Sequence, residues 1–375
     1  MRLAATRRAV GAKLARDVRS ARPGALPLLR AGTTLTEEYC RALLEAGIRA
    51  VYVDDELSRG IEVTPTLSES TRTAAETALE RAFREVPAAL QGGDPLPEAT
   101  LGELTEVAKL IAAEVAAADD AVVALADLAA ADAYTLQHSI DVAVLGLILA
   151  SRLFRDHGWL DGRARHSTIG VDDALVRLGV GLLLHDVGKL AVPQEILDKP
   201  TALDEHEWEL VRLHPALGVE LIATEQISYH SKAVIRSHHE RWDGRGYPDG
   251  LSGERIPQFA RIASVADVYD AVTSDRPYRA AASPAAGHAT ITAGTGTMFD
   301  PEVVRVFRRV VAPYPPGTEV TLQDGRRALV AGVPPGRLDR PVVRVFADRN
   351  GRPLEPFELA LLDHPELRIV PVAPV

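Results

Sequence analysis

Cysteine is nearly absent from this chain of 375 residues, which contains one, Cys40. A single thiol cannot form a disulfide within its own chain, and it cannot supply the sulfur ligands of a zinc finger or an iron–sulfur cluster. Lysine is also scarce, with five residues against 37 arginines. The sequence therefore excludes a disulfide scaffold and a thiolate metal site. Because lysine is rare, a lysine next to a candidate site is a stronger indication of function.

A net positive charge and a long hydrophobic run are missing as well. The formal charge is −10, whereas nucleic acids and anionic lipids favour basic faces, so no nucleic-acid polymer is expected as a partner. The longest apolar stretch, Val142–Ala150, is about half the length that crosses a bilayer. The N-terminal segment lacks the apolar core of a signal peptide. These absences predict a cytoplasmic protein with no membrane span.

What is present is a large share of apolar residues, 46% of the chain, enough for a sizeable core. Between residues 101 and 312 these residues recur with helical spacing, which predicts an all-α domain. Asp204 and Glu207 have the spacing of a capping box. The expected helices are Leu101–Ala118, Ala121–Asp132, Leu136–Phe154, Val171–Leu184, Asp204–Leu213, Lys232–Glu240 and Pro257–Ser274.

Smaller modules are expected on both sides of this domain. Residues 1–60 predict an α/β module, with a helix at Leu35–Ala46 capped by Thr34 and a strand at Ile48–Val53. Residues 61–100 predict a helical linker, with a helix at Thr71–Phe83. Residues 313–375 predict a β-rich module with strands at Glu319–Leu322, Ala328–Ala331, Pro341–Phe346 and Arg368–Pro371. The expected fold class is therefore mainly α.

Histidine is unevenly distributed, with nine of the eleven between His138 and His239. Seven imidazole and carboxylate residues interrupt apolar sequence on different expected helices. A buried carboxylate without a partner costs several kcal/mol, so an aspartate in such a setting normally has a cation beside it. A metal ion would supply that charge. The seven candidate ligands are His138, His185, Asp186, His214, His238, His239 and Asp267.

Imidazole and carboxylate ligands without sulfur suit divalent iron, manganese, zinc or nickel. Seven ligands exceed the need of one ion, and the carboxylate of Asp186 is able to bridge two. Two metals about 3.5–4 Å apart can hold a bridging hydroxide and clamp both oxygens of a phosphoryl transfer, which indicates phosphoester hydrolysis. A single histidine on an apolar helix is more commonly a core residue. That interpretation is kept for His157, His166, His206, His230, His288 and His364.

Several motifs resemble the HD-GYP subgroup of the HD-domain phosphohydrolases. They are LLLHDVGKL, LDEHEWELVRLHPALG, SHHERWDGRGYPDGLSGERIP and ARIASVADVYDAVTSDRPYR, and the resemblance is close over residues 134–279. It implies a helical catalytic core, two divalent metal ions per chain, most commonly iron or manganese, and hydrolysis of the bacterial messenger cyclic di-GMP to pGpG, GMP or both.

Carried over position by position, the resemblance implies that the seven candidate ligands bind the two metal ions and that Asp186 bridges these ions. It assigns catalytic roles to Asp186 and Lys189, the lysine neutralising a phosphate oxygen. It places Tyr247 against a guanine and Arg276 and Arg279 against phosphates. Where some members have a glutamate that helps to hold a third metal, this chain has Tyr134. Two metals are therefore expected, not three.

Two alternatives stay open at this point. One is a catalytically silent module that senses cyclic di-GMP and signals to a partner. The other keeps the chemistry and changes the substrate to another cyclic dinucleotide or a nucleotide. No phospho-acceptor receiver pattern precedes the core, and the sequence is compatible with a homodimer or with a signalling-protein partner.

Overall fold

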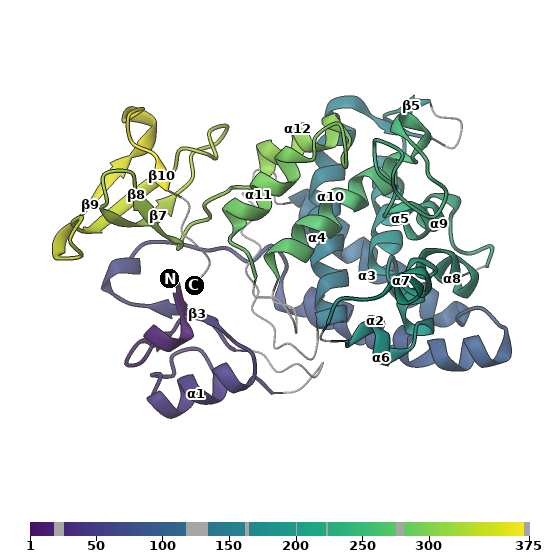
Figure 1. Cartoon of the computed structure of the whole chain (residues 1–375), viewed down its shortest axis with the longest axis horizontal. Coiled ribbons are helices and arrows are strands. Elements are labelled where there is room, and N and C mark those ends of the chain that lie inside the picture. Colours follow the sequence, from purple (N-terminus) through teal and green to yellow (C-terminus); the bar gives the residue numbers. More distant parts are fainter. Residues whose placement is uncertain are drawn as a thin grey trace.

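A computed structural model describes residues 1–18, 26–117, 134–161, 165–199, 201–222, 224–274 and 281–370. Figure 1 shows most of the helices gathered in one body, with the N-terminal part and a C-terminal sheet beside it. The expected fold class, a mainly α chain with a helical core and small strand-containing modules, is confirmed.

The helical body encloses one continuous hydrophobic core between Leu67 and Val311. Within it, α5 packs against α3, α4 and α9, and α10 packs against α4. The expected helix Ala121–Asp132 lies outside the described residues. The helices of the body are α2 (Glu69–Gly92), α3 (Glu98–Ala117), α4 (Tyr134–His157), α5 (Val171–Leu183), α6 (Gln194–Leu197), α7 (Glu205–Arg212), α8 (His214–Leu221), α9 (Tyr229–Ser237), α10 (Gln258–Thr273), α11 (Pro284–Ala293) and α12 (Pro301–Val310).

Side-chain caps define where several of these helices begin. The capping box predicted for α7 is present, since Asp204 accepts from the Glu207 amide at 2.9 Å and Glu207 accepts from the Asp204 amide at 2.8 Å. Ser68 caps α2, which is longer than the expected Thr71–Phe83 at both ends. Because Ala75, Leu79 and other α2 side chains lie in the main core, α2 packs as part of the helical body.

Helix α4 is long and contains an extended apolar stretch. Its stretch Leu136–His157 is long and apolar enough to cross a membrane, and 72% of the apolar window within it is buried inside the protein. That surface is covered by α5, α10 and α3. The helix therefore crosses the middle of the core and carries His138 near its start.

The N-terminal part has its own hydrophobic cluster between Ala4 and Val53. Its antiparallel sheet has the order β1-β3-β2, formed by β1 (Arg2–Ala5), β2 (Lys13–Leu14) and β3 (Ala50–Asp54), with α1 (Glu37–Glu45) beside it. The cap predicted at Thr34 is wrong. Thr36 accepts from the Tyr39 amide at 3.1 Å, whereas Thr34 pairs with Lys13 in a β-bridge.

The C-terminal part is a five-stranded antiparallel sheet around a third hydrophobic cluster. Its order is β10-β6-β7-β8-β9. The strands are β6 (Glu319–Leu322), β7 (Arg327–Gly332), β8 (Val342–Ala347), β9 (Pro353–Ala360) and β10 (Ile369–Val370). Strand β9 was not anticipated, because its two prolines and two glutamates disrupt the β pattern. It lies at the edge of the sheet, where proline is tolerated.

The two small parts contact each other through hydrogen bonds to backbone carbonyls. The Leu3 amide donates to the Gly317 carbonyl at 2.9 Å. The Arg344 guanidinium on β8 donates to the carbonyls of Leu57 and Arg59 at 2.8 and 2.7 Å. These bonds join segments far apart in the sequence, so the beginning of the chain is held by the C-terminal sheet.

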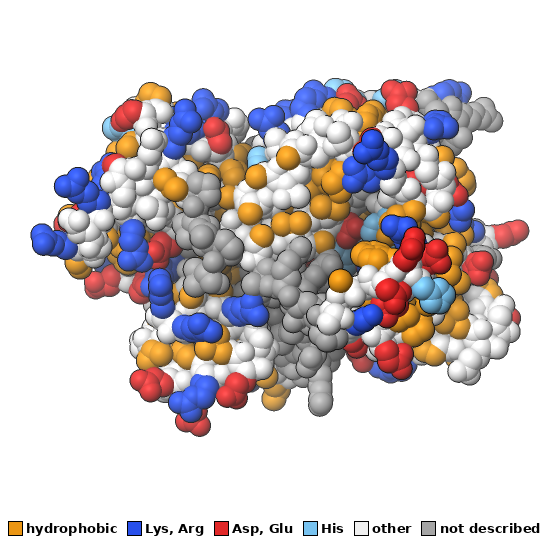
Figure 2. All heavy atoms as spheres, viewed as in Figure 1, with side chains coloured by type: hydrophobic (Ala, Val, Ile, Leu, Met, Phe, Trp, Pro, Cys, Tyr) orange, Lys and Arg blue, Asp and Glu red, His pale blue; other side chains and the backbone are white. Residues whose placement is uncertain are grey.

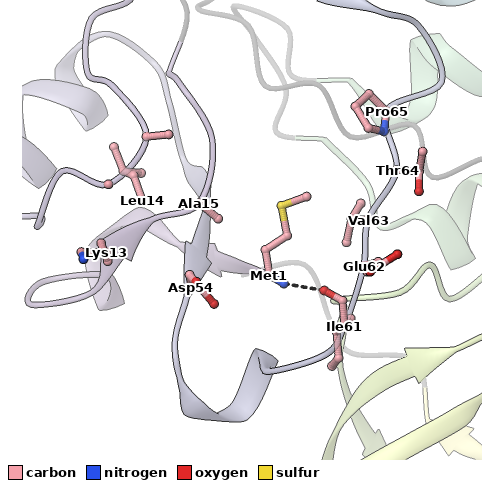
Figure 3. A pocket seen from close by; sticks show the side chains of 12 residues that line it. Met1, Lys13, Leu14, Ala15, Asp54, Ile61, Glu62, Val63, Thr64 and Pro65 are labelled. Carbon is pink, nitrogen blue, oxygen red and sulfur yellow. Dashed lines mark hydrogen bonds between the residues drawn. The ribbon is translucent and has the colours of Figure 1, made fainter.

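An open hollow of about 580 Å³ lies in the N-terminal part (Figure 3). Lys13 and Asp54 border it on one side and the segment 61–65 on the other. The amino group of Met1 donates to the Ile61 carbonyl at 2.6 Å beside it. None of the residues that line this hollow belongs to the site predicted from the sequence.

Candidate metal centre

The fold brings the seven predicted ligands together from five separate segments. His138 is on α4, His214 is the first residue of α8, and Asp267 is on α10. His185 and Asp186 follow α5 directly, and His238 and His239 follow the end of α9. All are buried except His239, whose side chain is 24% exposed.

Asp186 lies at the centre of this cluster. Its Oδ1 is 3.4 Å from His214 Nε2 and 3.8 Å from His238 Nε2. Its Oδ2 is 3.5 Å from His185 Nε2 and 3.6 Å from His138 Nε2. Each oxygen therefore faces its own pair of imidazoles, which is the arrangement expected of a carboxylate that bridges two ions.

The ligand atoms form two groups that share Asp186. One contains His138, His185 and Asp186, and the other contains Asp186, His214, His238 and His239; within each group the ligand atoms lie within 4.8 Å of one another. Asp267 stands between the groups, with Oδ1 3.3 Å from His138 Nε2 and Oδ2 3.9 Å from His239 Nδ1.

Backbone carbonyls fix the orientation of three of the imidazoles. A carbonyl only accepts, so each Nδ1 donates its proton and each Nε2 keeps a free lone pair in the neutral ring. Those lone pairs point into the cluster. The three bonds run from His185 to Leu182 at 2.7 Å, from His214 to Val211 at 2.7 Å and from His238 to Ile235 at 3.0 Å.

His138 is oriented by a carboxylate instead. Its Nδ1 donates to Asp270 Oδ2 at 2.6 Å, and Asp270 Oδ1 accepts from the Ser274 hydroxyl at 3.0 Å. Although burial alone would lower it, hydrogen bonds to Asp267 and Asp270 raise the pKa of His138 to about 10. Asp270 was missed from the sequence. Its signal was the three-residue spacing from Asp267, which places both carboxylates on one helix face.

The other titratable groups are held in the forms that bind metal. Burial lowers the pKa of His185 and His238, that of His214 to about 4 and that of His239 to about 3, so all four rings are neutral at pH 7. Although burial opposes it, Lys189 and the imidazoles hold the pKa of the Asp186 carboxyl well below its usual range. Neutral imidazoles therefore lie around an ionised carboxylate, which the protonated His138 ring also faces.

The cluster contains an unpaired carboxylate oxygen and closely spaced ring nitrogens that a cation would satisfy. Asp186 Oδ1 is buried and accepts no hydrogen bond from the described residues, which is costly for an ionised carboxylate. Two pairs of Nε2 atoms, His185 with His138 and His214 with His238, are only 3.3 Å apart. This donor set of nitrogens and carboxylate oxygens fits divalent ions such as iron or manganese.

Lys189 lies one turn beyond the His185–Asp186 pair. Its Nζ is 2.5 Å from Asp186 Oδ2, and its side chain is 30% exposed. The ammonium therefore touches the cluster on one side and solvent on the other. That is the place predicted for a lysine that meets a phosphate oxygen.

Tyr247 and its loop cover the cluster at His239. The two rings stack with centroids 4.7 Å apart and an angle of 27°. Glu240, 2% exposed, holds the loop by accepting from the amides of Asp249 and Leu251 at 2.7 and 2.9 Å. A Cβ on Gly246 would clash with the backbone of residues 239–241, so the loop needs glycine there to approach.

The remaining predicted residues fall into two groups. Arg276 and Arg279 lie outside the described residues, as does the side chain of Tyr134. The six histidines interpreted as bystanders contribute no atom to either ligand group. They lie instead against aromatic rings, as His230 and His288 do, or in hydrogen bonds and exposed positions.

Comparison with known proteins places the site within a family segment. Residues 171–303 match a family model described as the HD domain. This segment contains all the predicted ligands except His138, which lies on the helix before it.

Similar proteins are found among bacterial enzymes. A cyclic di-GMP phosphodiesterase of Pseudomonas aeruginosa is 40% identical over 63% of this chain and 53% of its own length. A 3′3′-cGAMP-specific phosphodiesterase of Vibrio cholerae is 37% identical over 48% of this chain and 36% of its own. A solved protein of Bdellovibrio bacteriovorus described as an HDG"Y"P protein has a TM-score of 0.48 and 14% identity, and the match covers 81% of this chain and 97% of that one. The chain spans about half the length of the first of these relatives.

Proposed function

We propose, on the premise that residues 171–303 match the family model described as the HD domain, that the protein is a metal-dependent phosphodiesterase that hydrolyses cyclic di-GMP. The observation that carries the proposal is the position of Asp186. Each of its carboxylate oxygens faces a separate pair of imidazoles, so one residue serves both halves of a two-metal site.

The proposed centre holds two divalent ions, iron or manganese, through the seven ligands that the fold gathers. His138 and His185 would hold one ion, His214, His238 and His239 would hold the other, and Asp186 would be shared between them, with Asp267 beside both groups. Two ions held in this way supply the Lewis acidity that phosphodiester hydrolysis needs at neutral pH. Asp270 keeps the His138 ring in place by accepting from its Nδ1.

The residues beside the centre bind and orient the substrate. Lys189, already in contact with Asp186, offers its ammonium to a non-bridging phosphate oxygen and offsets the charge that develops there. Burial and the nearby charges of Asp267 and Asp186 raise the pKa of Tyr247, so its phenol stays protonated and can donate a hydrogen bond. Arg276 and Arg279 are proposed as further phosphate contacts, and Tyr247 as a face for a guanine. The product is pGpG, with GMP after a second cleavage.

The other parts of the chain are proposed as accessory modules of a cytoplasmic signalling enzyme. Residues 1–60 and 313–375 have hydrophobic clusters separate from that of the helical body. Hydrogen bonds between them hold the two parts together. A signal received there would have to reach the centre through the helical body.

The test is a turnover assay on the purified protein. The protein is loaded anaerobically with Fe(II) or with Mn(II), supplied with cyclic di-GMP, and the products are separated by chromatography. We expect pGpG or GMP, two metals per chain, and in Lys189→Ala retained metals with turnover reduced by about 10²-fold or more. Binding of cyclic di-GMP without turnover under both metals would instead support the silent sensor.

A second substrate is favoured by one observation. A relative at 37% identity is named as a 3′3′-cGAMP-specific phosphodiesterase, so this mixed guanine–adenine dinucleotide is the second candidate substrate. Competition between cyclic di-GMP and 3′3′-cGAMP in the same assay decides between them.

A further inference from the structure

An exposed tryptophan and an arginine stand next to the Tyr247 loop, on α7. Trp208 is 46% exposed, although it is one of only three tryptophans in the chain. Arg212, one turn later on the same helix, places its guanidinium carbon 5.9 Å from the Trp208 ring and 5.7 Å from the Tyr247 ring. Figure 2 shows hydrophobic, basic, acidic and histidine side chains side by side over the region where Figure 1 draws α7 and α8.

These contacts form a continuous path to the metal centre. Trp208 touches Arg212, Arg212 touches Tyr247, and Tyr247 stacks on His239, a proposed metal ligand. Arg212 is also two residues before His214, the first residue of α8 and another proposed ligand. The exposed pair is therefore fixed in position relative to the centre from two directions.

Arg212 has a charge that nothing else in the described part of the chain neutralises. Its guanidinium makes ring contacts, but no described carboxylate pairs with it. The neighbouring arginines at the site differ, because Arg236 pairs with Asp249 and Arg241 pairs with Asp243. An exposed guanidinium that lies 5.9 and 5.7 Å from two aromatic ring centroids, and that pairs with no carboxylate among the described residues, is ready to bind a ligand.

Purine bases fit this pair better than phosphate does. Aromatic faces accept a base by stacking, whatever its identity. A guanidinium fork donates to O6 and N7 of guanine, but adenine presents a donor in place of O6. Lys189 contacts Asp186 directly and is already proposed to bind the phosphate. Arg212 lies farther from the centre, on the other side of the Tyr247 ring.

We propose that Trp208 and Arg212 form a shelf that recognises a guanine base of the substrate, with Trp208 as the stacking face and Arg212 as the donor to O6 and N7. This shelf is a specificity determinant, and the inference rests on the proposed hydrolysis of a cyclic dinucleotide. The roles of the two residues can be tested separately, because stacking on Trp208 tolerates any base, whereas the Arg212 guanidinium distinguishes guanine from adenine.

The test compares four phosphodiesters in the metal-loaded enzyme. They are cyclic di-GMP, 3′3′-cGAMP, cyclic di-AMP and bis(p-nitrophenyl) phosphate, which has no base. In Arg212→Gln we expect the kcat/KM ratio of cyclic di-GMP to cyclic di-AMP to fall roughly tenfold or more, because glutamine pairs with adenine N6 and N7. Arg212→Lys keeps the positive charge but lacks the two parallel N–H donors of the guanidinium. The kcat/KM ratio of cyclic di-GMP to cyclic di-AMP should therefore fall in this variant as well.

Trp208→Leu should behave differently. It should raise KM for every cyclic dinucleotide by a similar factor, leaving the ratios between them unchanged, because it removes only stacking. Arg84→Gln is the matched control for arginine loss, since Arg84 is exposed on α2 and pairs with Glu80 at 2.7 Å. It should change neither the rates nor the ratios.

Two outcomes would overturn the shelf. One is an Arg212→Gln variant whose base preference is that of the wild type. The other is an equal loss on bis(p-nitrophenyl) phosphate and on cyclic di-GMP, which would assign Arg212 to phosphate. If the wild type cleaves no cyclic dinucleotide, the proposed function fails separately. Quenching of tryptophan fluorescence by cyclic di-GMP then tests the shelf, and it is overturned if Trp208→Leu shows the same quenching as the wild type.

Discussion

At the scale of single residues, Asp186 is the position on which the centre depends. Asp186→Ala removes the carboxylate that faces both pairs of imidazoles, so bound metal should fall from two per chain to below one. Turnover of cyclic di-GMP should fall by at least about 10³-fold, because both ions act on one reaction. Elemental analysis of the anaerobically prepared protein measures the first effect, and the chromatographic assay measures the second.

Asp198→Asn is the control, because Asp198 is exposed and contacts Gln194. It should retain both metals and full turnover. If Asp186→Ala kept two metals per chain, the bridging role would be wrong even if activity were lost.

His138 and Asp270 make metal binding dependent on pH. Because the pKa of His138 is raised to about 10, its imidazole is protonated at pH 7.5 in the metal-free protein and must lose that proton to bind a metal. Metal affinity should therefore rise with pH between 6 and 9. Loading should release about one proton per chain from His138. Calorimetry in buffers of different ionisation enthalpy counts that proton.

Asp270→Asn tests the source of the effect. Loss of the carboxylate lowers the pKa of His138 towards its usual value, so less proton is released at pH 7.5. The ring also loses its orienting partner, which should weaken metal binding by about 10- to 100-fold. Unchanged proton release in this variant would assign the raised pKa to another group.

The candidate ligands were predictable because a polar residue within an apolar helix is expected to be buried, and burial costs free energy unless a partner compensates for it. That argument selected His138, His214 and Asp267 without any knowledge of their distances. It did not select Asp270, since one carboxylate per helix already explained the pattern. Nor did it select Arg212, because an arginine at the end of an amphipathic helix looks like ordinary solvated charge until the rings of Trp208 and Tyr247 are seen beside it.

At the scale of elements, the centre depends on how closely the short 3-10 helix Val187–Ala191 approaches α8. A Cβ on Gly188 would clash with the His214 carbonyl and the Gly218 amide. Gly188→Ala should therefore push His214 away from Asp186, lower metal affinity and destabilise the fold by at least about 2 kcal/mol. Chemical denaturation and metal titration measure the two effects.

Gly102→Ala provides the matched comparison. Gly102 is exposed on α3, and no heavy atom lies within 4 Å of an added Cβ. The same substitution there should stabilise the protein by about 0.5–1 kcal/mol, because alanine favours helix. If both variants lost stability equally, the close approach at Gly188 would not be the cause.

The type of an element was predictable from the periodicity of apolar residues. The residue at which it begins or ends depends on capping side chains, which that periodicity does not reveal. α9 begins at Tyr229 because Ser228 caps it, and it ends at Ser237 instead of continuing through His239. That early end matters, since His238 and His239 leave the helix and turn towards Asp186. α11 and α12 were not anticipated either, although both begin with a proline in the first turn, which favours a helix start.

At the scale of the whole molecule, the accessory parts are joined to each other by few bonds. Strand β8 and the segment after β3 meet through Arg344, whose guanidinium also pairs with Glu358. Periodicity in the sequence could not indicate this contact, because it is made to backbone carbonyls nearly 300 residues away. Any signal between the two parts would have to cross it.

Arg344→Met keeps the length of the side chain and removes its donors. The carbonyls of Leu57 and Arg59 then lose their partner, at a cost of about 1–3 kcal/mol. Hydrogen exchange should increase in residues 1–60 and in β8, while α4, α5 and α10 exchange as before and two metals remain bound. Arg337→Met is the control, since Arg337 is exposed and only reaches Asp339 at 3.5 Å. Faster exchange in α4 would mean that the modules stabilise the helical body, and that their contact acts on the metal centre itself.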